Sequence, residues 1–518
     1  MNKPRQFLGF LVALFGLMLA LSILMPKEKW ILGPFEIGYF SPEDLLGPFW
    51  SENPKDAKAF KASSSDSSHS KNSADSLARL AFEKPVLDTL IQVDALDALG
   101  HFFDALESLA AGKRTSVRII HYGDSQIEGD RITMQFRDVL QKRFGGRGFG
   151  YVALEPLVMP ASLDFINSYG LARKTAFGRR DTNIKDTRYG HLGSFTTLLP
   201  ASEGEGFEGG VTFKKRNWGY QMARDFSKVK MSLSTQTPLS VDVFVADTLF
   251  ASHVFPAEFE DITYINVPEA KEFSIVLKAK ESPRIYGLSF ESTSGVWVDN
   301  VAMRGASGMI FRKLDRAQFQ ATLLRENYEL VILQYGGNAV PYLKDTADAE
   351  RFAKAAAAQV AHIKRLHPSA SILYIGPSDM AVKNGLKMRS YPIIKVLKSA
   401  LRNEMLAKGA AYWDLHDVMG GEGAMVRWVE EEEPALAVKD YCHFSPAGAK
   451  YVGYKLAAAL DHLQAEYIAH KKKVAALAAS QEKAKADSVL ARKAKQEKQA
   501  AQTIDTASKQ ETPYEKNN

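Results

Sequence analysis

Residues 116–125 read SVRIIHYGDS, and the pattern within and after this stretch decides the fold. Residues 116–122 form an apolar run typical of a short buried strand, and the run ends at Gly123-Asp124-Ser125. Apolar residues then recur at helical spacing: Ile132, Met134, Phe136, Val139 and Leu140. The sequence therefore predicts a strand, a tight turn that presents Ser125, and a helix.

The same alternation returns in the second half of the chain. Strand-like runs at 330–335, 371–375 and 411–415 are separated by helical patterns at 346–366 and 391–406. A further helical pattern at 87–109, stopped by Gly112, opens the folded body. Strands that alternate with helices predict an α/β fold, with a parallel sheet covered by helices on both faces.

Residues 151–297 interrupt this rhythm, because they contain no long helical pattern. They contain instead alternating, strand-like runs at 241–245, 262–267, 273–277 and 285–290. A block of this size is large enough for a domain of its own. We predict a β-sandwich that is inserted into the α/β unit, rather than further strands of the same sheet.

The amino-terminal segment predicts a membrane anchor. Residues 7–25 carry no charge, follow Lys3 and Arg5, and are long enough to span a bilayer. No small-residue cleavage site follows, so an uncleaved anchor (1–26) is favoured over a cleaved signal peptide. Either alternative predicts that the rest of the chain is exported. The Ser-rich segment 27–84 is then a flexible tether.

Composition excludes several other classes of protein. A single cysteine in 518 residues excludes an internal disulfide framework and a cysteine-based metal cluster. The formal net charge is +6, but residues 471–518 hold 11 Lys and Arg against 6 Asp and Glu, so the rest of the chain is nearly neutral. No nucleic-acid partner is therefore expected. The basic, Ala/Lys-rich tail (464–518) predicts a solvated helix that frays into disorder, with contact to an anionic polymer as the alternative.

A second chemical motif lies near the carboxyl end of the folded body. Asp440-Tyr441-Cys442-His443 precedes Ser445-Pro446, which can cap and open a helix. A carboxylate three residues before an imidazole can bind one ring nitrogen and leave the other to deprotonate a serine. By itself this motif is common, and so is the tripeptide that ends in Ser125, which could equally cap a helix.

Two further segments offer donors for an oxyanion. The strand at 330–335 leads into Gly336-Gly337-Asn338, and a strand at 298–303 leads into Arg304-Gly305. Acyl transfer needs such donors to stabilise a tetrahedral intermediate. Each segment could be an ordinary turn, but four such elements at strand ends or helix starts are hard to explain by turns alone.

The four segments together resemble the SGNH (GDSL-like) hydrolase family. The blocks lie at 123–125, 300–305, 336–338 and 440–443, and the resemblance covers about residues 85–150 and 298–463. It implies a three-layer α/β/α, flavodoxin-like domain that needs no cofactor. It also implies roles for individual residues: Ser125 as nucleophile, His443 as general base, Asp440 as its orienter, and Ser125 N–H, Gly305 N–H and Asn338 as oxyanion hole.

The chain departs from the family pattern at two positions, where Gln126 replaces a leucine or histidine and Ala339 replaces an aspartate. Neither change removes a catalytic atom. Gly308 is an alternative to Gly305 as the glycine whose N–H belongs to the oxyanion hole. A metal is not expected, because His416-Asp417 and His101 lack a second ligand at metal spacing. Cys442 is expected to pack rather than to react.

The inserted β-rich block is similar to the plan of bacterial peptidoglycan O-acetylesterases. This likeness implies an exported, membrane-tethered esterase that removes acetyl or short acyl groups from a cell-envelope glycan, with Trp218, Tyr220 and Trp297 available to stack on sugar rings. One alternative is an O-acyltransferase that uses the same triad, because a sugar hydroxyl can resolve an acyl-enzyme as water can. Another is a non-catalytic wall-binding or scaffolding protein.

Overall fold

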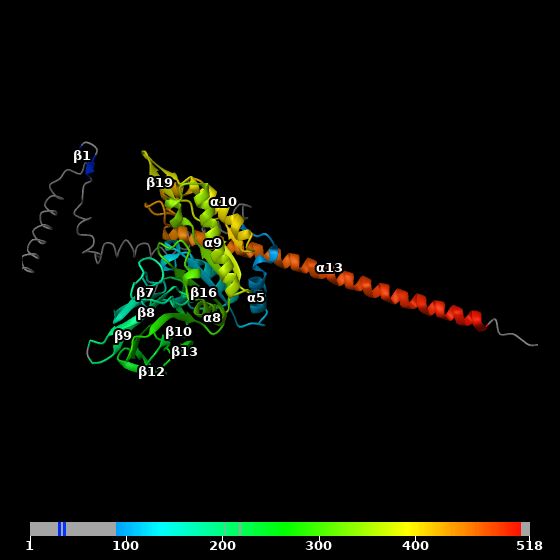
Figure 1. Cartoon of the computed structure of the whole chain (residues 1–518), viewed down its shortest axis with the longest axis horizontal. Helices are drawn as coiled ribbons and strands as arrows, with labels where there is room; N and C mark the ends of the chain where they lie inside the picture. The colour runs from blue at the N-terminus through cyan, green and yellow to red at the C-terminus, as the bar shows by residue number, and fades with distance from the viewer. Residues whose placement is uncertain (1–29, 33–34, 38–89, 203, 217–218, 509–518) are drawn as a thin grey trace, which may run out of the picture. The chain divides into compact units, whose positions relative to one another are not determined.

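The computed structural model describes residues 30–32, 35–37 and 90–508, apart from 203 and 217–218 (Figure 1). The predicted anchor at 7–25 and nearly all of the predicted tether lie outside these residues. Within the tether, β1 (Trp30–Leu32) and β2 (Phe35–Ile37) pair as an antiparallel hairpin. In the described part of the chain, every helix is too short or too polar to cross a bilayer.

A six-stranded sheet forms the centre of the α/β unit. Its order is β16-β4-β17-β18-β21-β3, with the first five strands parallel and β3 antiparallel to β21. The bounds are β3 (Ile91–Gln92), β4 (Ser116–Gly123), β16 (Gly295–Ala302), β17 (Tyr328–Gln334), β18 (Ser371–Ile375) and β21 (Ala411–Trp413). Numbered along the chain, the parallel strands follow the order 2-1-3-4-5, which is the flavodoxin-like arrangement.

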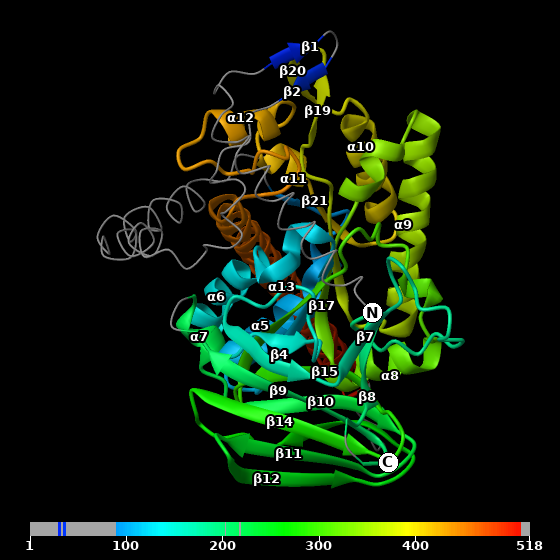
Figure 2. The same cartoon turned by 90° about the vertical axis from the view of Figure 1, so that its left-hand side faces the viewer.

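Helices cover both faces of this sheet, because its strands are apolar on both sides (Figure 2). On β4, Val117 and Ile119 pack into one core, and Ile120 and Tyr122 into the other. The first core includes residues of α5 (Gly100–Ala110), α6 (Thr133–Phe144) and α13 (Pro446–Ser508). The second includes residues of α8 (Arg316–Glu326), α9 (Thr346–Leu366) and α10 (Ile393–Leu406). The predicted parallel sheet between two helical layers is therefore confirmed.

Three details differ from the sequence prediction. In the described part of the pattern at 87–109, the chain is helical only from Leu96 onward, because Ile91–Gln92 is the edge strand β3 and pairs with β21. Helix α8 was not predicted. Strand β16 starts at Gly295, so the predicted domain boundary at 297 falls inside a strand of the central sheet. The remaining described elements are α7 (Gln221–Arg224), β19 (Ala381–Asn384), β20 (Lys387–Ser390), α11 (Leu415–Val418), α12 (Ala424–Glu430) and four short 3₁₀ turns at Leu96–Leu99, Ser125–Asp130, Phe311–Lys313 and Gly337–Tyr342.

Eleven antiparallel strands connect β4–α6 to β16, and we call them the insert. They are β5 (Gly150–Val152), β6 (Leu163–Tyr169), β7 (Leu171–Thr175), β8 (Ser194–Pro200), β9 (Phe207–Lys215), β10 (Lys228–Thr235), β11 (Leu239–Val245), β12 (Thr248–Phe255), β13 (Phe259–Ile265), β14 (Glu272–Ala279) and β15 (Arg284–Glu291). Strands β9 and β15 are not hydrogen-bonded neighbours, yet the rings of Phe213 and Phe290 lie 5.5 Å apart. The strands therefore form two layers around a shared apolar core.

The two ends of the insert touch through backbone atoms. Val296 N donates a hydrogen bond to Gly145 O at 2.9 Å. Gly146 has a φ of +107°, and a Cβ there would lie 2.5 Å from Val296 N. Glycine is required at this position because both the backbone angle and the available space exclude a side chain. The insert therefore leaves the α/β unit and rejoins it at one point.

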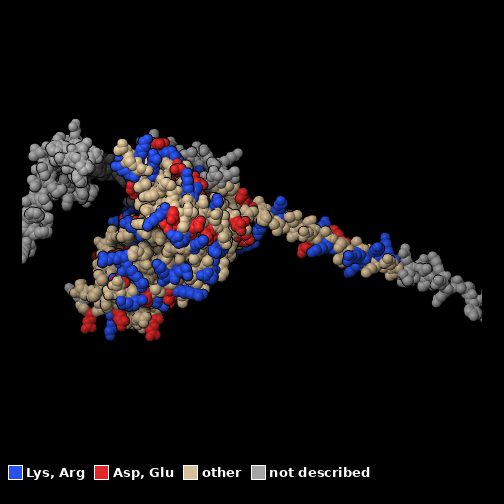
Figure 3. Space-filling model, turned by 45° about the horizontal axis from the view of Figure 1, so that its top comes forward, with Lys and Arg blue, Asp and Glu red and all other residues tan. Residues whose placement is uncertain are grey.

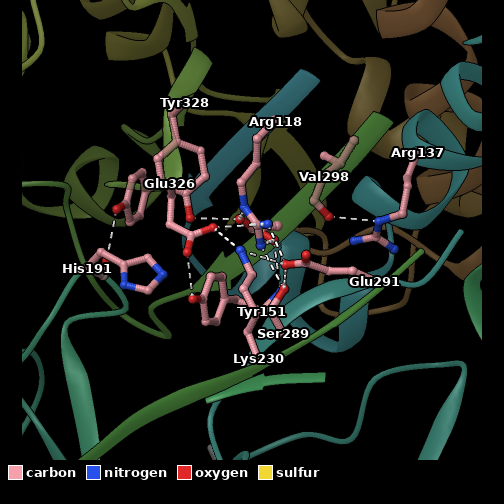
Figure 4. A network of polar contacts seen from close by, with 12 residues as sticks. Arg118, Arg137, Tyr151, His191, Lys230, Ser289, Glu291, Val298, Glu326 and Tyr328 are labelled. Atoms are coloured by element: carbon pink, nitrogen blue, oxygen red, sulfur yellow. Dashed lines mark hydrogen bonds and ion pairs between the residues drawn. The ribbon is translucent and has the colours of Figure 1, made fainter. Parts of the chain in front are cut away.

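A buried polar network joins the insert to the central sheet (Figure 4). Arg118 on β4 is 2 % exposed and binds both carboxylate oxygens of Asp299, at 2.8 and 2.9 Å. The same guanidinium reaches Glu291 of the insert at 2.6 Å and Glu326 of α8 at 3.1 Å. Lys230 of the insert binds Glu326 at 2.6 Å. These charges compensate one another across the boundary between the two parts.

The last 63 residues of the described chain form a single helix. Helix α13 begins at Pro446, as predicted, and Ser445 caps it by accepting a hydrogen bond from Gly448 N at 3.1 Å. From Ala469 to Ala501 every side chain is exposed. Figure 3 shows side chains of both charges along this part of the helix. The predicted solvated helix is therefore present, and it is supported by packing only at its start.

Candidate active site

Ser125 lies where the chain leaves the carboxyl end of β4. It begins a short 3₁₀ turn (Ser125–Asp130), and Asp124 caps this turn by accepting a hydrogen bond from Gln126 N at 2.9 Å. Strands β4 and β17 are neighbours at the point where the strand order reverses. In open α/β sheets this switch point is where ligands bind. The alternative prediction, that this tripeptide caps a helix, is therefore confirmed for Asp124. The cap leaves the hydroxyl of Ser125 free to face the site.

Asp440 and His443 lie on the loop that precedes α13. The Asp440 carboxylate accepts hydrogen bonds from the backbone of Cys442 and of His443, both at 2.9 Å. Tyr441 closes the turn with a φ of +56°. The loop is tied to the strand β19 by a hydrogen bond from Ala381 N to Tyr441 O at 3.0 Å. These bonds fix the spacing of the carboxylate and the imidazole within one turn.

The structure brings Ser125, His443 and Asp440 into one hydrogen-bonded chain. Ser125 Oγ lies 2.8 Å from His443 Nε2, and His443 Nδ1 lies 2.7 Å from Asp440 Oδ2. Burial opposes ionisation of Asp440, but hydrogen bonds from the backbone and ring of His443 and from Cys442 N hold its pKa below the ordinary value. An ionised Asp440 keeps the proton on Nδ1, so Nε2 is free to accept the serine proton.

Asn338 lies beside this chain, in a 3₁₀ turn (Gly337–Tyr342) that follows β17. Its Nδ2 donates to Asp124 Oδ2 at 2.9 Å and to Ala306 O at 3.1 Å. Burial raises the pKa of Asp124 to about 6, although hydrogen bonds from Gln126 and Asn338 partly offset the effect. Both amide hydrogens are thus engaged, and a substrate oxygen has to displace one acceptor; the longer bond, to Ala306, is the weaker of the two.

The two candidate glycines have different surroundings. Gly305 has a φ of +74°, and nothing lies within 4 Å of the position of a Cβ. Gly308 has a φ of +80°, and a Cβ there would lie 2.7 Å from the ring of Tyr335. Gly305 lines the same groove as Ser125, Asn338 and His443. Geometry therefore favours Gly305 as the exposed glycine and assigns Gly308 to packing.

Two cavities meet at Ser125 and His443. One has a volume of about 210 Å³ and runs between the 337–342 turn and the segment 376–380, with Cys442 and Leu415 in its wall. The other is a groove of about 780 Å³, lined by Gly305, by Arg131 and by residues of the loop before α13. Asn338 lines both. An ester whose carbonyl lies at Ser125 can therefore place its two substituents in different spaces.

The insert contributes directly to the larger groove, through Val158, Met159, Ala161 and Arg216. Of the aromatic residues predicted to stack on sugars, Trp297 is not accessible, because it is 9 % exposed and lies beside Arg118. Tyr220 is half-buried, and its hydroxyl donates a hydrogen bond to Gln135 Oε1. Trp218 lies outside the described residues.

Three side chains around the site were not predicted from the sequence. Gln126 and Arg131 each bind the loop that carries His443. Arg304 pairs with Glu128 through both carboxylate oxygens at the edge of the groove. These contacts join residues that lie more than a hundred positions apart in sequence, so local patterns do not predict them. The one indication in the sequence was the glutamine at position 126, where the family pattern has a leucine or histidine.

Neither Cys442 nor the His416 region offers an alternative chemistry. Burial, together with the charges of Asp440 and Asp124, raises the pKa of Cys442 to about 12, so the group is a neutral thiol. Asp414 joins His416 and Asp417 within 4.8 Å, so the expectation that this pair lacks a further ligand was wrong. Lys398 already forms ion pairs with both carboxylates, however, and lies 3.2 Å from Asp414.

Comparison with known proteins supports the fold. No protein-family model matches the chain, and no curated protein matches its sequence at a significant level. A solved structure of a peptidoglycan O-acetylesterase matches with a TM-score of 0.55 and 20 % sequence identity, over 71 % of this chain and 96 % of that one. At this identity the likeness shows a shared fold. The predicted resemblance to peptidoglycan O-acetylesterases is therefore confirmed at the level of the fold.

Two other solved structures match less well, with TM-scores well below that of the esterase. The salicylyl-acyltransferase SsfX3 matches with a TM-score of 0.26 and 11 % identity, over 58 % of this chain and 97 % of that one. The acetyl xylan esterase AlAXEase matches with a TM-score of 0.25 and 15 % identity, over 31 % and 79 %.

Proposed function

We propose that the protein is a serine esterase in which Ser125 is the nucleophile, His443 the general base and Asp440 its orienter. The observation that carries this proposal is the unbroken hydrogen-bonded chain from Ser125 Oγ through the imidazole to Asp440, at 2.8 and 2.7 Å. It lies at the switch point of the sheet and opens to cavities on two sides. A nucleophile, a base and an orienter in this geometry define acyl transfer.

The reaction follows from the positions of these groups. His443 Nε2 takes the proton from Ser125 Oγ as the oxygen attacks the ester carbonyl, and the negative charge moves to the carbonyl oxygen. Ser125 N–H, Gly305 N–H and Asn338 Nδ2 are the proposed donors to that oxygen. His443 then protonates the departing alcohol. Water attacks the acyl-enzyme by the same path in reverse and releases the acid.

Hydrolysis is favoured over transfer to a second sugar by the exposure of the site. The side chain of His443 is 30 % exposed and that of Asp440 is 47 % exposed, and both line the open groove. An acyl-enzyme there is accessible to water. Acyl transfer to a glycan hydroxyl, measured beside acetate release, would identify the acyltransferase alternative.

We propose an O-acetylated cell-envelope glycan, such as peptidoglycan, as the substrate. Two observations support this: the fold is shared with a peptidoglycan O-acetylesterase, and the groove of about 780 Å³ extends from Ser125 onto the insert. An extended groove suits a polymer, whereas a small ester needs only the triad.

The test is acetate release from isolated O-acetylated peptidoglycan by the purified protein and by Ser125→Ala. We expect the variant to fold normally and to lose at least about 1,000-fold in rate, as is typical when a triad member is removed. Equal acetate release by the two proteins would refute the serine mechanism. Hydrolysis of a synthetic ester without any release from peptidoglycan would refute only the substrate. A folded wild-type protein without activity on either would favour the scaffolding alternative.

We also propose that the catalytic unit is exported and tethered to the membrane through residues 7–25. The support is the length of this uncharged segment and the two basic residues before it. Protease added to intact spheroplasts should degrade the catalytic unit. Degradation only after membrane disruption would contradict this orientation.

A further inference from the structure

The loop that carries His443 must be held at the right distance from Ser125, and the triad's own bonds do not do this. Asp440 binds Cys442 N, His443 N and the imidazole, all within one turn. These bonds fix the imidazole relative to its own loop. They do not fix that loop relative to the strand end that carries Ser125.

Gln126 makes the connection between the two segments. Its Nε2 donates to Cys442 O at 2.6 Å, and its Oε1 accepts from Phe444 N at 3.4 Å. The side-chain amide thus binds the residue before His443 and the residue after it. Ser378 Oγ, at 3.4 Å from Nε2, holds the amide from its other side.

Burial shields this connection from water more than it shields the Asp440 bond. Gln126 is 9 % exposed, whereas the side chain of Asp440 is 47 % exposed. Solvent screens the exposed carboxylate, whereas water competes little for hydrogen bonds in the interior. Among the residues that the structure describes, only Gln126 and Arg131 bind both this loop and the Ser125 turn, apart from the Ser125–His443 bond itself. Arg131 does so through Ser125 O and, at 3.4 Å, Phe444 O.

We propose that Gln126 is a positioning residue that sets the distance between Ser125 Oγ and His443 Nε2. This inference rests on the proposed esterase activity and adds a residue to it. Gln126 directly follows Ser125 in the chain, and its side-chain amide binds both neighbours of His443. A shift of the Ser125 backbone therefore moves the loop that carries His443 with it. Displacement of a catalytic group by about 1 Å can cost about 100-fold in rate.

The test uses Gln126→Met, which keeps the length of the side chain and removes both hydrogen bonds. We expect kcat for a small activated ester to fall about 10- to 100-fold, with KM within about twofold of the wild-type value, because Ser125, Asn338 and the larger groove are unchanged. Phosphonylation of Ser125 by an organophosphate should slow by a similar factor. A crystal structure of the variant should show the Ser125–His443 distance lengthened.

Gln141→Met is the matched control. Gln141 is also buried, and its Nε2 binds two backbone carbonyls, Gly148 O at 2.9 Å and Val296 O at 3.2 Å, away from the site. It should lose stability like Gln126→Met and keep its kcat. Equal losses of kcat in the two variants at equal loss of Tm, or a kcat for Gln126→Met within twofold of wild type, would overturn the proposal.

A second variant covers the case in which Gln126→Met does not fold. Gln126→Glu has nearly the same shape but presents an oxygen to Cys442 O, so we expect the same fall in kcat. Unchanged kcat in this variant would also overturn the proposal. If Ser125→Ala abolishes hydrolysis while the Gln126 variants retain it, only the positioning role fails. If wild type hydrolyses no ester, the proposed function itself fails.

Discussion

At the scale of single residues, Asp124 is a carboxyl group beside the site with a raised pKa. It is 4 % exposed, and burial raises its pKa from 3.8 to about 6. A pKa that is higher in the folded state than in the unfolded chain means that the folded protein binds the proton more tightly. The group therefore stabilises the fold fully below pH 3.8, and this contribution is lost as the pH rises through about 6.

Replacement of Asp124 by asparagine removes this titration. At about 1.4 kcal/mol per pH unit, the free energy of unfolding of Asp124→Asn relative to wild type should rise by about 2 kcal/mol between about pH 4 and about pH 7. Any constant cost of the lost hydrogen bonds does not affect this slope. Urea titrations at several pH values measure it. A difference that does not change with pH would contradict the raised pKa.

The glycine assignment gives a second prediction at this scale. Gly305→Ala places a methyl group in open space but strains a backbone with a φ of +74°. We expect kcat to fall about 100-fold, as for loss of an oxyanion donor, and Tm to fall only by what the backbone strain of about 1–3 kcal/mol causes. In Gly308→Ala the new methyl group clashes with the ring of Tyr335. This variant should show a larger fall in Tm than Gly305→Ala and a smaller fall in kcat. Ester kinetics and thermal unfolding of both variants test this, and the reverse pattern would shift the glycine block by three residues.

The sequence predicted those site residues that belong to short local patterns. Ser125 ends a strand-turn motif, and Asp440 and His443 are three residues apart in one turn. The contacts of Asp124 with Asn338, and of Gln126 with Cys442 and Phe444, join segments more than 200 residues apart in sequence. Periodicity and spacing describe only one segment at a time, so they do not contain this information.

At the scale of elements, sequence pattern was most successful where an element is long or fully buried. Helix α9 (Thr346–Leu366) and strand β18 (Ser371–Ile375) have the predicted bounds. Helix α8 was missed because only Phe319, Leu323 and Glu326 of its side chains are buried, which is too few for a clear stripe. A signal was present, because Asp315 caps this helix by accepting from Gln318 N.

The contact between β4 and the insert depends on Arg118. Its removal leaves the buried carboxylate of Asp299 without its cation and leaves Glu291 and Glu326 with Lys230 alone, and we expect Arg118→Met to lower the free energy of unfolding by about 3–5 kcal/mol. Burial alone would raise the pKa of Glu326, but Arg118 and Lys230 hold it below 4.5. The contribution of Glu326 is therefore present above that pH and is lost as the pH falls through the lowered pKa. The effect of Arg118→Met should accordingly shrink in acid.

Arg143→Met is the control for this prediction. Arg143 also pairs with a carboxylate, that of Asp461, but both side chains are about half exposed. We expect a change below about 1 kcal/mol, because solvent screens exposed ion pairs. Denaturant titrations of both variants provide the measurement. Equal effects would mean that the buried network contributes no more than a surface pair.

At the scale of the whole molecule, the insert and the hydrolase-like unit share one groove. Val158 lies in this groove and is 40 % exposed. Val158→Asn should leave hydrolysis of a small ester unchanged and lower kcat/KM on polymeric glycan about fivefold, which corresponds to about 1 kcal/mol of binding. Leu249→Asn alters an exposed residue of β12 outside the groove and should change neither activity. Equal effects of Val158→Asn on both substrates would assign Val158 to the catalytic step.

Point changes are preferable to excision of the insert. Lys230, Ser289 and Glu291 of the insert satisfy the Arg118 network. Without them, charged groups of the central sheet would lose their partners in an apolar setting, so a shortened chain is expected to be unstable for reasons unrelated to substrate binding.

The backbone contact at Gly146 also bears on how the chain folds. Strand β16 pairs with β4 from Ser116 opposite Gly295, which are 179 residues apart. An unfolded loop of that length slows closure, whereas a folded insert brings its two ends together and acts as a short connection. The insert has its own apolar core. We therefore expect insert amides to become protected before those of β16 in pulse-labelled hydrogen exchange during refolding. The insert, which lies in the middle of the chain, would then fold first and bring β16 to its place beside β4 in the central sheet.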